Sequence, residues 1–270
     1  MGRPYAEVIG DPIAHSKSPL IHNFWLGKLG IDAEYRACHV RADDLTDYFT
    51  RRRGDAEWRG CNVTVPHKVT AMKHVRVRKG TRMMVGAINT VVRGSDSRLD
   101  GGNTDIAGVV RPLESVGMSG GSMAVVGAGG AARAAVAASM ILGIETLFVL
   151  NRTEAKARDL LASLRPDGIV IPLDGPVPSV SVLVNASVLG MTGQPALNLS
   201  LEGIARDAIV FDMVYAPLET QLLAEARRRG LRTIDGLQML VAQAAEAFEL
   251  LFDVPAPREY DAELRALLTA

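Results

Sequence analysis

The chain has 270 residues, of which 48% are apolar, and 30 Lys and Arg residues balance 30 Asp and Glu residues. This length suits one large domain or two ordinary ones, and the charge balance excludes a global field for nucleic acid or an anionic membrane. Two cysteines are too few for a disulfide-rich secreted fold, and no signal peptide is visible. We therefore expect a cytoplasmic protein that binds no nucleic acid, membrane or metal.

Short apolar runs alternate with helical patterns, which is typical of βα units around a mainly parallel sheet. In the first part of the chain the runs "AEVIG", "GCNVTV" and "GAINTVVR" predict strands. The segments "SPLIHNFWLGKLG", "PHKVTAMKHV" and "NTDIAGVVRPLESVG" predict the helices that follow strands there. The second of these would begin at Pro66 and would carry Lys68 in its first turn.

The first predicted helix has recognisable ends and a candidate apolar face. Ser18 is the expected N-cap, followed by a proline, and Gly30 is the expected stop. The face toward the core would consist of Leu20, Phe24 and Leu29.

From residue 121 the alternation becomes regular. The runs "SMAVV", "TLFVLNR", "SVLVNAS", "AIVFDMVY" and "RTIDG" predict strands, and "ETQLLAEARRRG" and "LQMLVAQAAEAFELLF" predict helices. Because this middle block is a complete doubly wound unit, we predict an α/β protein with two domains. A substrate-binding domain would comprise residues 1–105 and 238–270, and a Rossmann-type dinucleotide-binding domain residues 106–237.

A glycine-rich turn opens the middle block. Gly127, Gly129 and Ala132 follow the pattern G-x-G-x-x-G/A, directly after an apolar strand and before a helix of small residues. The first glycine permits the tight turn, the second lets backbone N–H groups approach a pyrophosphate, and the alanine allows close packing. We therefore predict a dinucleotide cofactor.

The end of the next strand bears on which cofactor is bound. An NAD site usually carries an acidic residue there, whereas this strand ends in "VLNRTEAK". Asn151, Arg152, Thr153 and Lys156 offer hydrogen-bond donors and two positive charges, which suits the 2′-phosphate of NADP. Glu154 argues against this, and Asn151 with Thr153 could simply cap the next helix.

Three strand-to-helix junctions in the first domain, "HSKSP", "NVTVPHK" and "GGNTD", are rich in polar groups. Ligands of open α/β sheets bind beyond the carboxyl ends of the strands, so these junctions could share one cleft. Each also has a plain structural explanation, because Ser18 and Thr64 could cap helices and Asp105 would complement a helix dipole.

Together these junctions resemble the shikimate dehydrogenase family. The resemblance extends from "VIGDPIAHSKSPLIHN" through "NVTVPHK", "GAINTVV" and "GGNTDIAG" to "VGAGGAAR", "NRT", "VNAS", "FDMVYAPLET" and "DGLQMLVAQAAEAFEL". It implies a substrate domain joined to an NADP-binding Rossmann domain, with the active site in the cleft between them. The implied reaction is the NADP-dependent reduction of 3-dehydroshikimate to shikimate, a step toward chorismate and the aromatic amino acids.

The resemblance also implies residue roles for the substrate. Lys68 would be the catalytic group, paired with Asp105. Binding of the substrate carboxylate would fall to Ser16 and Ser18. The remaining substrate contacts would come from Thr64, Asn89, Tyr215 and Gln243, with Tyr215 closing the cleft.

For the cofactor, the resemblance implies a phosphate loop and an adenosine-phosphate clamp. The clamp would be Asn151, Arg152 and Thr153, with Lys156 nearby. The other expected cofactor contacts are Gly127, Ala128, Gly129, Gly130, Ala131, Met213 and Gly236.

Two positions depart from the family pattern. His67 stands where many members have an aromatic residue, and we interpret it as an exposed helix residue, although it could face the hinge. Lys156 stands where arginine is common, which keeps the charge but loses the bidentate geometry.

The chemistry suits a lysine, because an ammonium group can stabilise negative charge on the carbonyl oxygen and supply the proton. Two alternatives stay open: a quinate/shikimate dehydrogenase using NAD, and a non-catalytic ligand sensor on the same fold. A small-molecule substrate and a monomer or homodimer are expected in either enzymatic case.

Overall fold

The computed structural model describes residues 2–77 and 85–270, which pack into two compact units. The first unit combines the chain up to Thr104 with Gln243–Ala270, and the second comprises Asp105–Ala242. The second boundary falls inside one helix, α8 (Gly236–Phe252).

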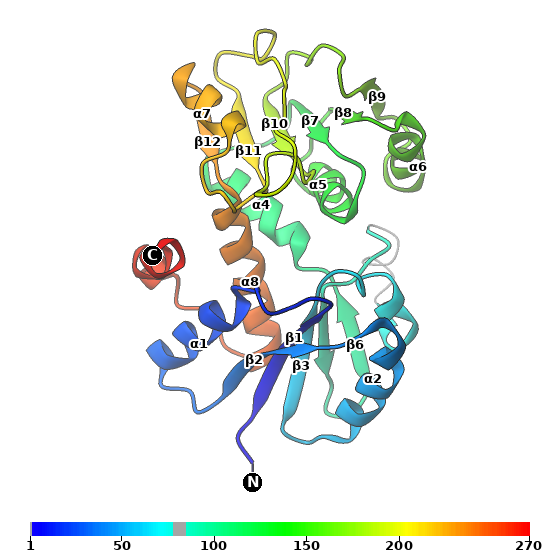
Figure 1. Ribbon diagram of the computed structural model, residues 1–270, viewed down its shortest axis with the longest axis vertical. Helices are drawn as coiled ribbons and strands as arrows, with labels where there is room; N and C mark the ends of the chain where they lie inside the picture. Colours follow the sequence, from blue (N-terminus) through cyan, green and yellow to red (C-terminus); the bar gives the residue numbers. More distant parts are fainter. Residues whose placement is uncertain (1, 78–84) are drawn as a thin grey trace. The chain divides into compact units, whose positions relative to one another are not determined.

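The first unit contains a six-stranded mixed sheet in the order β2-β1-β3-β5-β6-β4 (Figure 1). β1 pairs in parallel with β2 and β3, whereas β5 is antiparallel to β3 and β6. The strands are β1 (Tyr5–Gly10), β2 (Glu34–His39), β3 (Trp58–Val63), β4 (Arg76–Val77), β5 (Thr90–Arg93) and β6 (Leu99–Gly102). Its helices are α1 (Ser18–Leu29), α2 (Leu45–Gly54), the 243–252 part of α8, and α9 (Asp261–Thr269), with 3₁₀ turns η1 (Ala42–Asp44), η2 (Thr70–Lys73) and η3 (Arg258–Tyr260).

Helix α1 differs from the sequence prediction in its buried face. Ser18, Ile21, His22 and Trp25 are buried, at the spacing i, i+3, i+4, i+7 of a single helix face. The predicted face was wrong, because Leu20 points the opposite way and is 42% exposed. The helix also begins one residue earlier, with Lys17 as N-cap, whereas the predicted stop at Gly30 is confirmed by its left-handed φ of 64°.

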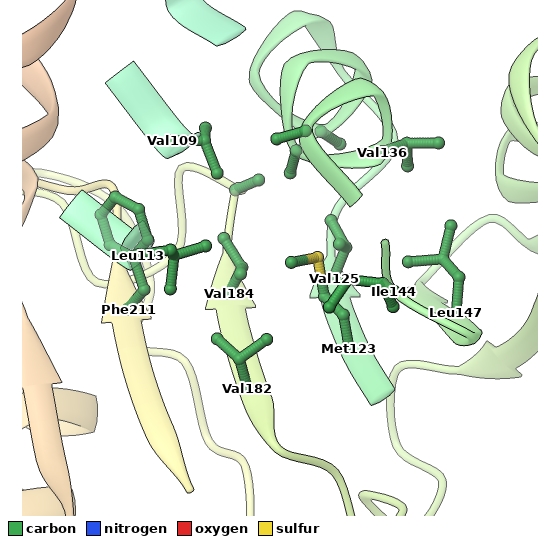
Figure 2. Close-up of a cluster of buried hydrophobic side chains, with 14 of the residues drawn as sticks. Val109, Leu113, Met123, Val125, Val136, Ile144, Leu147, Val182, Val184 and Phe211 are labelled. Carbon is green, nitrogen blue, oxygen red and sulfur yellow. The ribbon is translucent and has the colours of Figure 1, made fainter. Parts of the chain in front are cut away.

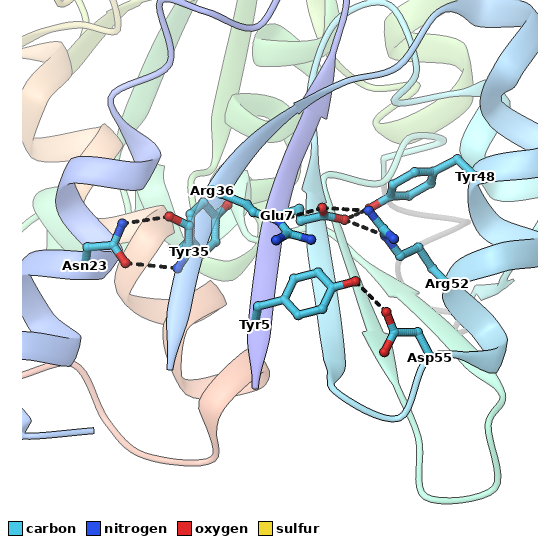
Figure 3. Close-up of polar contacts among 8 residues, drawn as sticks. All are labelled: Tyr5, Glu7, Asn23, Tyr35, Arg36, Tyr48, Arg52 and Asp55. Carbon is cyan, nitrogen blue, oxygen red and sulfur yellow. Dashed lines mark hydrogen bonds and ion pairs between the residues drawn. The ribbon is translucent and has the colours of Figure 1, made fainter. Parts of the chain in front are cut away.

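A buried ion cluster ties the sheet of the first unit to α2 (Figure 3). Glu7, in the middle of β1, is 1% exposed and accepts two 2.8 Å hydrogen bonds from the Arg52 guanidinium. Tyr48 Oη donates to the same carboxylate at 2.8 Å, and Arg36 Nε does so at 3.2 Å. Because every partner of this buried charge is a donor, its desolvation is compensated.

The segment after β3 is not the predicted helix. Residues 65–69 form turns, and η2 follows. The carbonyl of Lys68, which an α-helix would use for the N–H of residue 72, instead accepts from Ile88 N at 2.8 Å. The N–H of Met72 bonds to Val69 O. A hydrogen bond to the segment that contains Ile88 therefore replaces the helical hydrogen bond.

The second unit is a parallel six-stranded sheet in the order β12-β11-β10-β7-β8-β9 (Figure 1). In chain order this is 6-5-4-1-2-3, the doubly wound order of a Rossmann fold, which confirms the predicted fold class. The strands are β7 (Ser122–Val126), β8 (Thr146–Asn151), β9 (Ile169–Pro172), β10 (Val182–Asn185), β11 (Ile209–Asp212) and β12 (Arg232–Ile234). The helices are α4 (Asp105–Ser115), α5 (Gly130–Ile141), α6 (Glu154–Leu164), α7 (Gln221–Arg228) and the 236–242 part of α8.

One hydrophobic cluster of the second unit lies between this sheet and helices α4 and α5, and another includes Leu222 and Leu223 of α7. Side chains from β7, β10 and β11 meet side chains from the two helices (Figure 2). Val125 and Val184 contribute from the sheet, and Leu113 and Val136 from the helices, all of them fully buried. No helix in the described residues is both long and apolar enough to span a bilayer.

Candidate functional site: substrate segments and dinucleotide pocket

In the first unit, backbone hydrogen bonds bring two of the predicted substrate segments to the carboxyl ends of β1 and β3. Thr64 N donates to Ile9 O at 2.9 Å, and Asp11 N donates to Val65 O at 3.1 Å. A Cβ on Gly10 would lie 2.6 Å from the Thr64 methyl group, so only glycine permits this approach. Thr64 therefore lies against the segment that leads from β1 to the predicted serine pair.

That serine pair forms a compact turn at the start of α1. Ser16 Oγ accepts a 3.3 Å hydrogen bond from the Ser18 N–H, and Ser16 N donates to Ile13 O at 3.0 Å. The predicted capping by Ser18 is wrong, since Lys17 is the N-cap and Ser18 is the first residue of the helix. Ser18 is 9% exposed and Ser16 is half-buried.

Lys68 follows Thr64 in the turn after β3, and its main chain is fixed on both sides. Its carbonyl binds Ile88 N, next to Asn89. The side chain of His67 is 1% exposed, and its Nε2 lies 2.7 Å from Val40 O. The prediction that His67 is exposed was wrong, because its ring anchors this turn to the end of β2. The contact requires a proton on Nε2, since a carbonyl can only accept.

Asn89 lies at the centre of a buried polar network. Its Oδ1 accepts from Thr104 N at 2.7 Å, and its Nδ2 donates to Thr104 Oγ1 at 3.0 Å. Thr104 Oγ1 in turn lies 3.5 Å from Gln243 Oε1, so α8 contacts the network. Asn89 and Gln243, which the sequence analysis assigned to the substrate, thus share Thr104 as a neighbour.

The residues that support this network were not predicted from the sequence. Asn62 Nδ2 donates to Thr90 Oγ1 at 2.9 Å, and Tyr35 Oη donates to Asn62 Oδ1 at 2.6 Å. Asn62 is 8% exposed. A usable signal was present, because an asparagine inside the apolar run "GCNVTV" must find buried partners.

In the second unit, a pocket of about 500 Å³ opens beside the glycine turn. Gly127, in the left-handed region with a φ of 111°, approaches Ala186 so closely that a Cβ would lie 3.0 Å from its carbonyl oxygen. A Cβ added to Gly129 or Gly130 would lie in open space, with no atom within 4 Å. The lining residues are Gly127, Ala128, Gly129, Gly130, Ala131, Asn151, Ala186, Ser187, Val188, Met191, Met213, Val214, Tyr215, Ala216 and Met239.

The start of α5 is chemically suited to a negatively charged group. Gly129 is the N-cap and Gly130 the first helical residue, with no side-chain cap and no acidic residue in the first turn. The first N–H groups of a helix lack partners within it, and the dipole favours negative charge there. These features are compatible with a pyrophosphate group, and the assignment of these residues to the cofactor stays a prediction.

The predicted adenosine clamp lies at the junction of β8 and α6. Asn151 lines the pocket and donates from Nδ2 to Thr153 O at 2.8 Å. Thr153 is the N-cap of α6, but its side chain makes no capping bond. Arg152 and Lys156 are exposed and form no ion pair within the described part of the chain, while Glu154 pairs with Arg158 at 3.0 Å. The carboxylate of Glu154, which argued against NADP, is thus paired with Arg158.

Three further predicted residues lie near the end of β11. Met213 and Tyr215 line the pocket, and Tyr215 is 39% exposed. Gly236 does not line it, and a Cβ there would lie 2.4 Å from Met213 O. Close backbone packing is therefore a sufficient reason for this glycine.

Asp105, predicted as the partner of Lys68, is the first residue of α4, where its charge complements the helix dipole.

A second polar cluster beside the pocket was not expected from the sequence. Asn185, at the end of β10, donates from Nδ2 to Asp212 Oδ1 at 2.9 Å, and its Oδ1 accepts from Ser187 Oγ at 2.7 Å. Thr220 Oγ1 donates to Asp212 Oδ2 at 2.7 Å. Burial raises the pKa of Asp212, although these hydrogen bonds oppose the shift. The cluster holds the loop that carries Ser187 and Val188 against the pocket.

Comparison with known proteins places these features in one family. The family described as "Shikimate dehydrogenase substrate binding domain" matches residues 8–91, and "Shikimate 5'-dehydrogenase C-terminal domain" matches residues 236–263. A shikimate dehydrogenase (NADP(+)) from Sphingopyxis alaskensis is 54% identical over 99% of this chain and 97% of its own.

Solved structures of two enzymes match this chain over nearly its full length. Shikimate 5-dehydrogenase from Thermus thermophilus, in complex with NADP(H) and shikimate, is 34% identical with a TM-score of 0.86, covering 97% of this chain and 99% of that one. Quinate dehydrogenase from Corynebacterium glutamicum, in complex with NAD, is 26% identical with a TM-score of 0.89, covering 98% and 99%.

Proposed function

Because this chain belongs to the shikimate dehydrogenase family, we propose that it interconverts 3-dehydroshikimate and shikimate with NADP(H), in the pathway to chorismate and the aromatic amino acids. The observation that carries the proposal is 54% identity to an NADP-dependent shikimate dehydrogenase over nearly the whole of both chains. The turn that carries Lys68 would supply the proton transfer. The start of α5 would bind the phosphates of the cofactor.

For the substrate, we assign the carboxylate to Ser16 and Ser18. Hydroxyl groups are suitable donors to a carboxylate, and no capping bond at the start of α1 engages the Ser18 side chain. Thr64, Asn89 and Gln243 are assigned to the ring hydroxyls. A site built to hydrogen-bond hydroxyl groups rejects analogues that lack them, so the buried Asn89–Thr104 network supports specificity.

For the reaction, we assign Lys68 as the general acid and base. Negative charge develops on the carbonyl oxygen during reduction, and an ammonium group within reach stabilises that charge and donates its proton. A lysine acts well only if its position is held, and the His67–Val40 and Lys68–Ile88 bonds restrain the turn that carries it. The role of Asp105 as orienting partner stays a prediction.

For the cofactor, the residues present fit NADP. When bound, this dinucleotide supplies or accepts the hydride. Gly129 and Gly130 would hold its pyrophosphate through backbone N–H groups, and Arg152 and Lys156 would hold the 2′-phosphate by charge. Met213 and Tyr215 are assigned to the pocket wall, where Tyr215 could serve either ligand. A cytoplasmic enzyme, acting as a monomer or homodimer, is the form we propose.

One alternative is a quinate/shikimate dehydrogenase that uses NAD, since the quinate dehydrogenase of Corynebacterium glutamicum, in complex with NAD, has a similar structure. Two exposed cations after β8, rather than a carboxylate, favour NADP here. A non-catalytic sensor on this fold is disfavoured because Lys68 and Asp105 are both retained.

The decisive test is a spectrophotometric assay of the purified protein with shikimate or quinate, each with NADP⁺ or NAD⁺. Turnover that is strong only with shikimate and NADP⁺ is expected. Preference for quinate or NAD⁺ would favour the first alternative, and absence of turnover with all four pairs would favour the sensor.

A further inference from the structure

Lys17, the middle residue of the "SKS" motif, has no role in the function proposed above. It is the N-cap of α1. A cation at the N-terminus of a helix faces the positive end of the helix dipole, so this position disfavours lysine. Its presence calls for a compensating contact elsewhere.

The side chain of Lys17 supplies that contact at the opposite end of another helix. Its Nζ donates to Leu268 O at 2.8 Å, across 251 residues of sequence. Leu268 belongs to the last turn of α9, where carbonyl groups lack partners within the helix and the dipole is negative. The charge that is unfavourable for α1 is therefore favourable for α9.

Helix α9 is a firm attachment point for this lysine. Its Leu264 and Leu268 side chains, one helical turn apart, are 0% and 5% exposed. A second link joins the other ends of the same helices, where Lys28 Nζ lies 2.7 Å from Glu263 and 4.6 Å from the centre of the Tyr260 ring. The two lysines therefore link α9 to both ends of α1.

Lys17 lies between the two serines that the proposed function assigns to the substrate carboxylate. The turn they form has one internal side-chain bond, Ser18 N to Ser16 Oγ, at a long 3.3 Å. We propose that Lys17 is a positioning residue: its bond to α9 holds Ser16 and Ser18 in the geometry that selects a carboxylate. This proposal rests on the proposed function.

The test compares Lys17→Met, which keeps the chain length without the charge, with Lys17→Arg and Lys28→Met. Lys28→Met removes the other α1–α9 link, far from the serines, and is the matched control. Lys17→Gln serves as a second variant if Lys17→Met expresses poorly. Michaelis constants do not depend on the fraction of folded protein, so partial misfolding does not obscure the result.

We expect Lys17→Met to raise the KM for shikimate about tenfold, with kcat and the KM for NADP⁺ little changed. The displaced serines would bind the substrate and the transition state more weakly by the same amount, so the chemical step would not slow. The preference of kcat/KM for shikimate over shikimate methyl ester should fall by a similar factor. Lys17→Arg should restore most of both, and Lys28→Met should match wild type.

Two results would overturn the proposal while leaving the proposed function intact. One is an active wild type with a Lys17→Met variant that matches Lys28→Met. The other is an equal loss on shikimate and on its methyl ester, which indicates general loosening of the fold. A wild type without shikimate turnover would instead refute the proposed function, and this proposal with it.

Discussion

His22 makes the stability of the first unit depend on pH. Its ring stacks on Tyr35 at 4.0 Å, is fully enclosed, and has an Nδ1 atom with no hydrogen-bond partner in the described structure. Burial lowers the pKa of His22 from 6.5 to about 3. Asn23, the next residue, exchanges two hydrogen bonds with the backbone of Tyr35, which keeps α1 on β2 (Figure 3).

The sign follows from proton linkage. Well above pH 6.5 the imidazole is neutral in both states and has no effect on stability. Below pH 6.5 the unfolded chain binds a proton that the folded chain does not, so the unfolding free energy falls until the pH approaches 3. Between pH 7 and pH 5 the expected loss is about 2 kcal/mol.

The assay is urea unfolding at pH 7, 6 and 5, followed by tryptophan fluorescence. Both tryptophans, Trp25 and Trp58, lie in the first unit, so the signal reports its unfolding. His22→Phe keeps an aromatic ring on Tyr35 and should remove about 2 kcal/mol of the pH dependence, whatever its effect at pH 7. His15→Gln, which changes an exposed histidine, should not. An unchanged pH dependence in His22→Phe would refute the reasoning.

The other predictions concern catalysis, cofactor choice and packing. Lys68→Ala should lower kcat by about 10²-fold or more, since it removes proton transfer, while shikimate binding measured by calorimetry is retained; turnover near wild type would exclude Lys68 as the acid. Joint replacement of Arg152 and Lys156 by Ala should raise the KM for NADP⁺ about tenfold or more without raising that for NAD⁺. Arg158→Ala is the control, because Arg158 already pairs with Glu154, and equal changes for both cofactors would contradict the clamp. Gly236→Ala should destabilise the protein by about 2 kcal/mol or more, since its Cβ would meet the Met213 carbonyl at 2.4 Å; an unchanged thermal midpoint would contradict the packing explanation.

The second unit was predictable because its signals are local. The glycine turn, the strand before it and the helix after it lie within some twenty residues, from Ser122 to Ile141. Gly127 adopts a left-handed φ of 111° within that span, and buried parallel strands appear as continuous apolar runs. The residues after β8 likewise indicate the cofactor without reference to distant parts of the chain.

In the first unit, local patterns misled where distant contacts decide the outcome. The segment after β3 reads as a helix, yet Ile88 takes the carbonyl that the helix would need. His67 reads as an exposed helix residue, yet Val40 accepts its ring N–H in the interior. Neither partner can be identified from the residues around positions 67 and 68.

The sequence by itself determined the fold class, the family, the dinucleotide loop and the candidates for substrate binding. Short-range periodicity and motif order carry that information, because each strand, turn and motif is formed by residues close together in the chain. Only the tertiary structure decided how the candidates are supported: Thr104 between Asn89 and Gln243, and Lys17 on the last turn of α9. Buried polar groups and helix ends must find partners wherever the chain brings them, and those partners lie tens to hundreds of residues away.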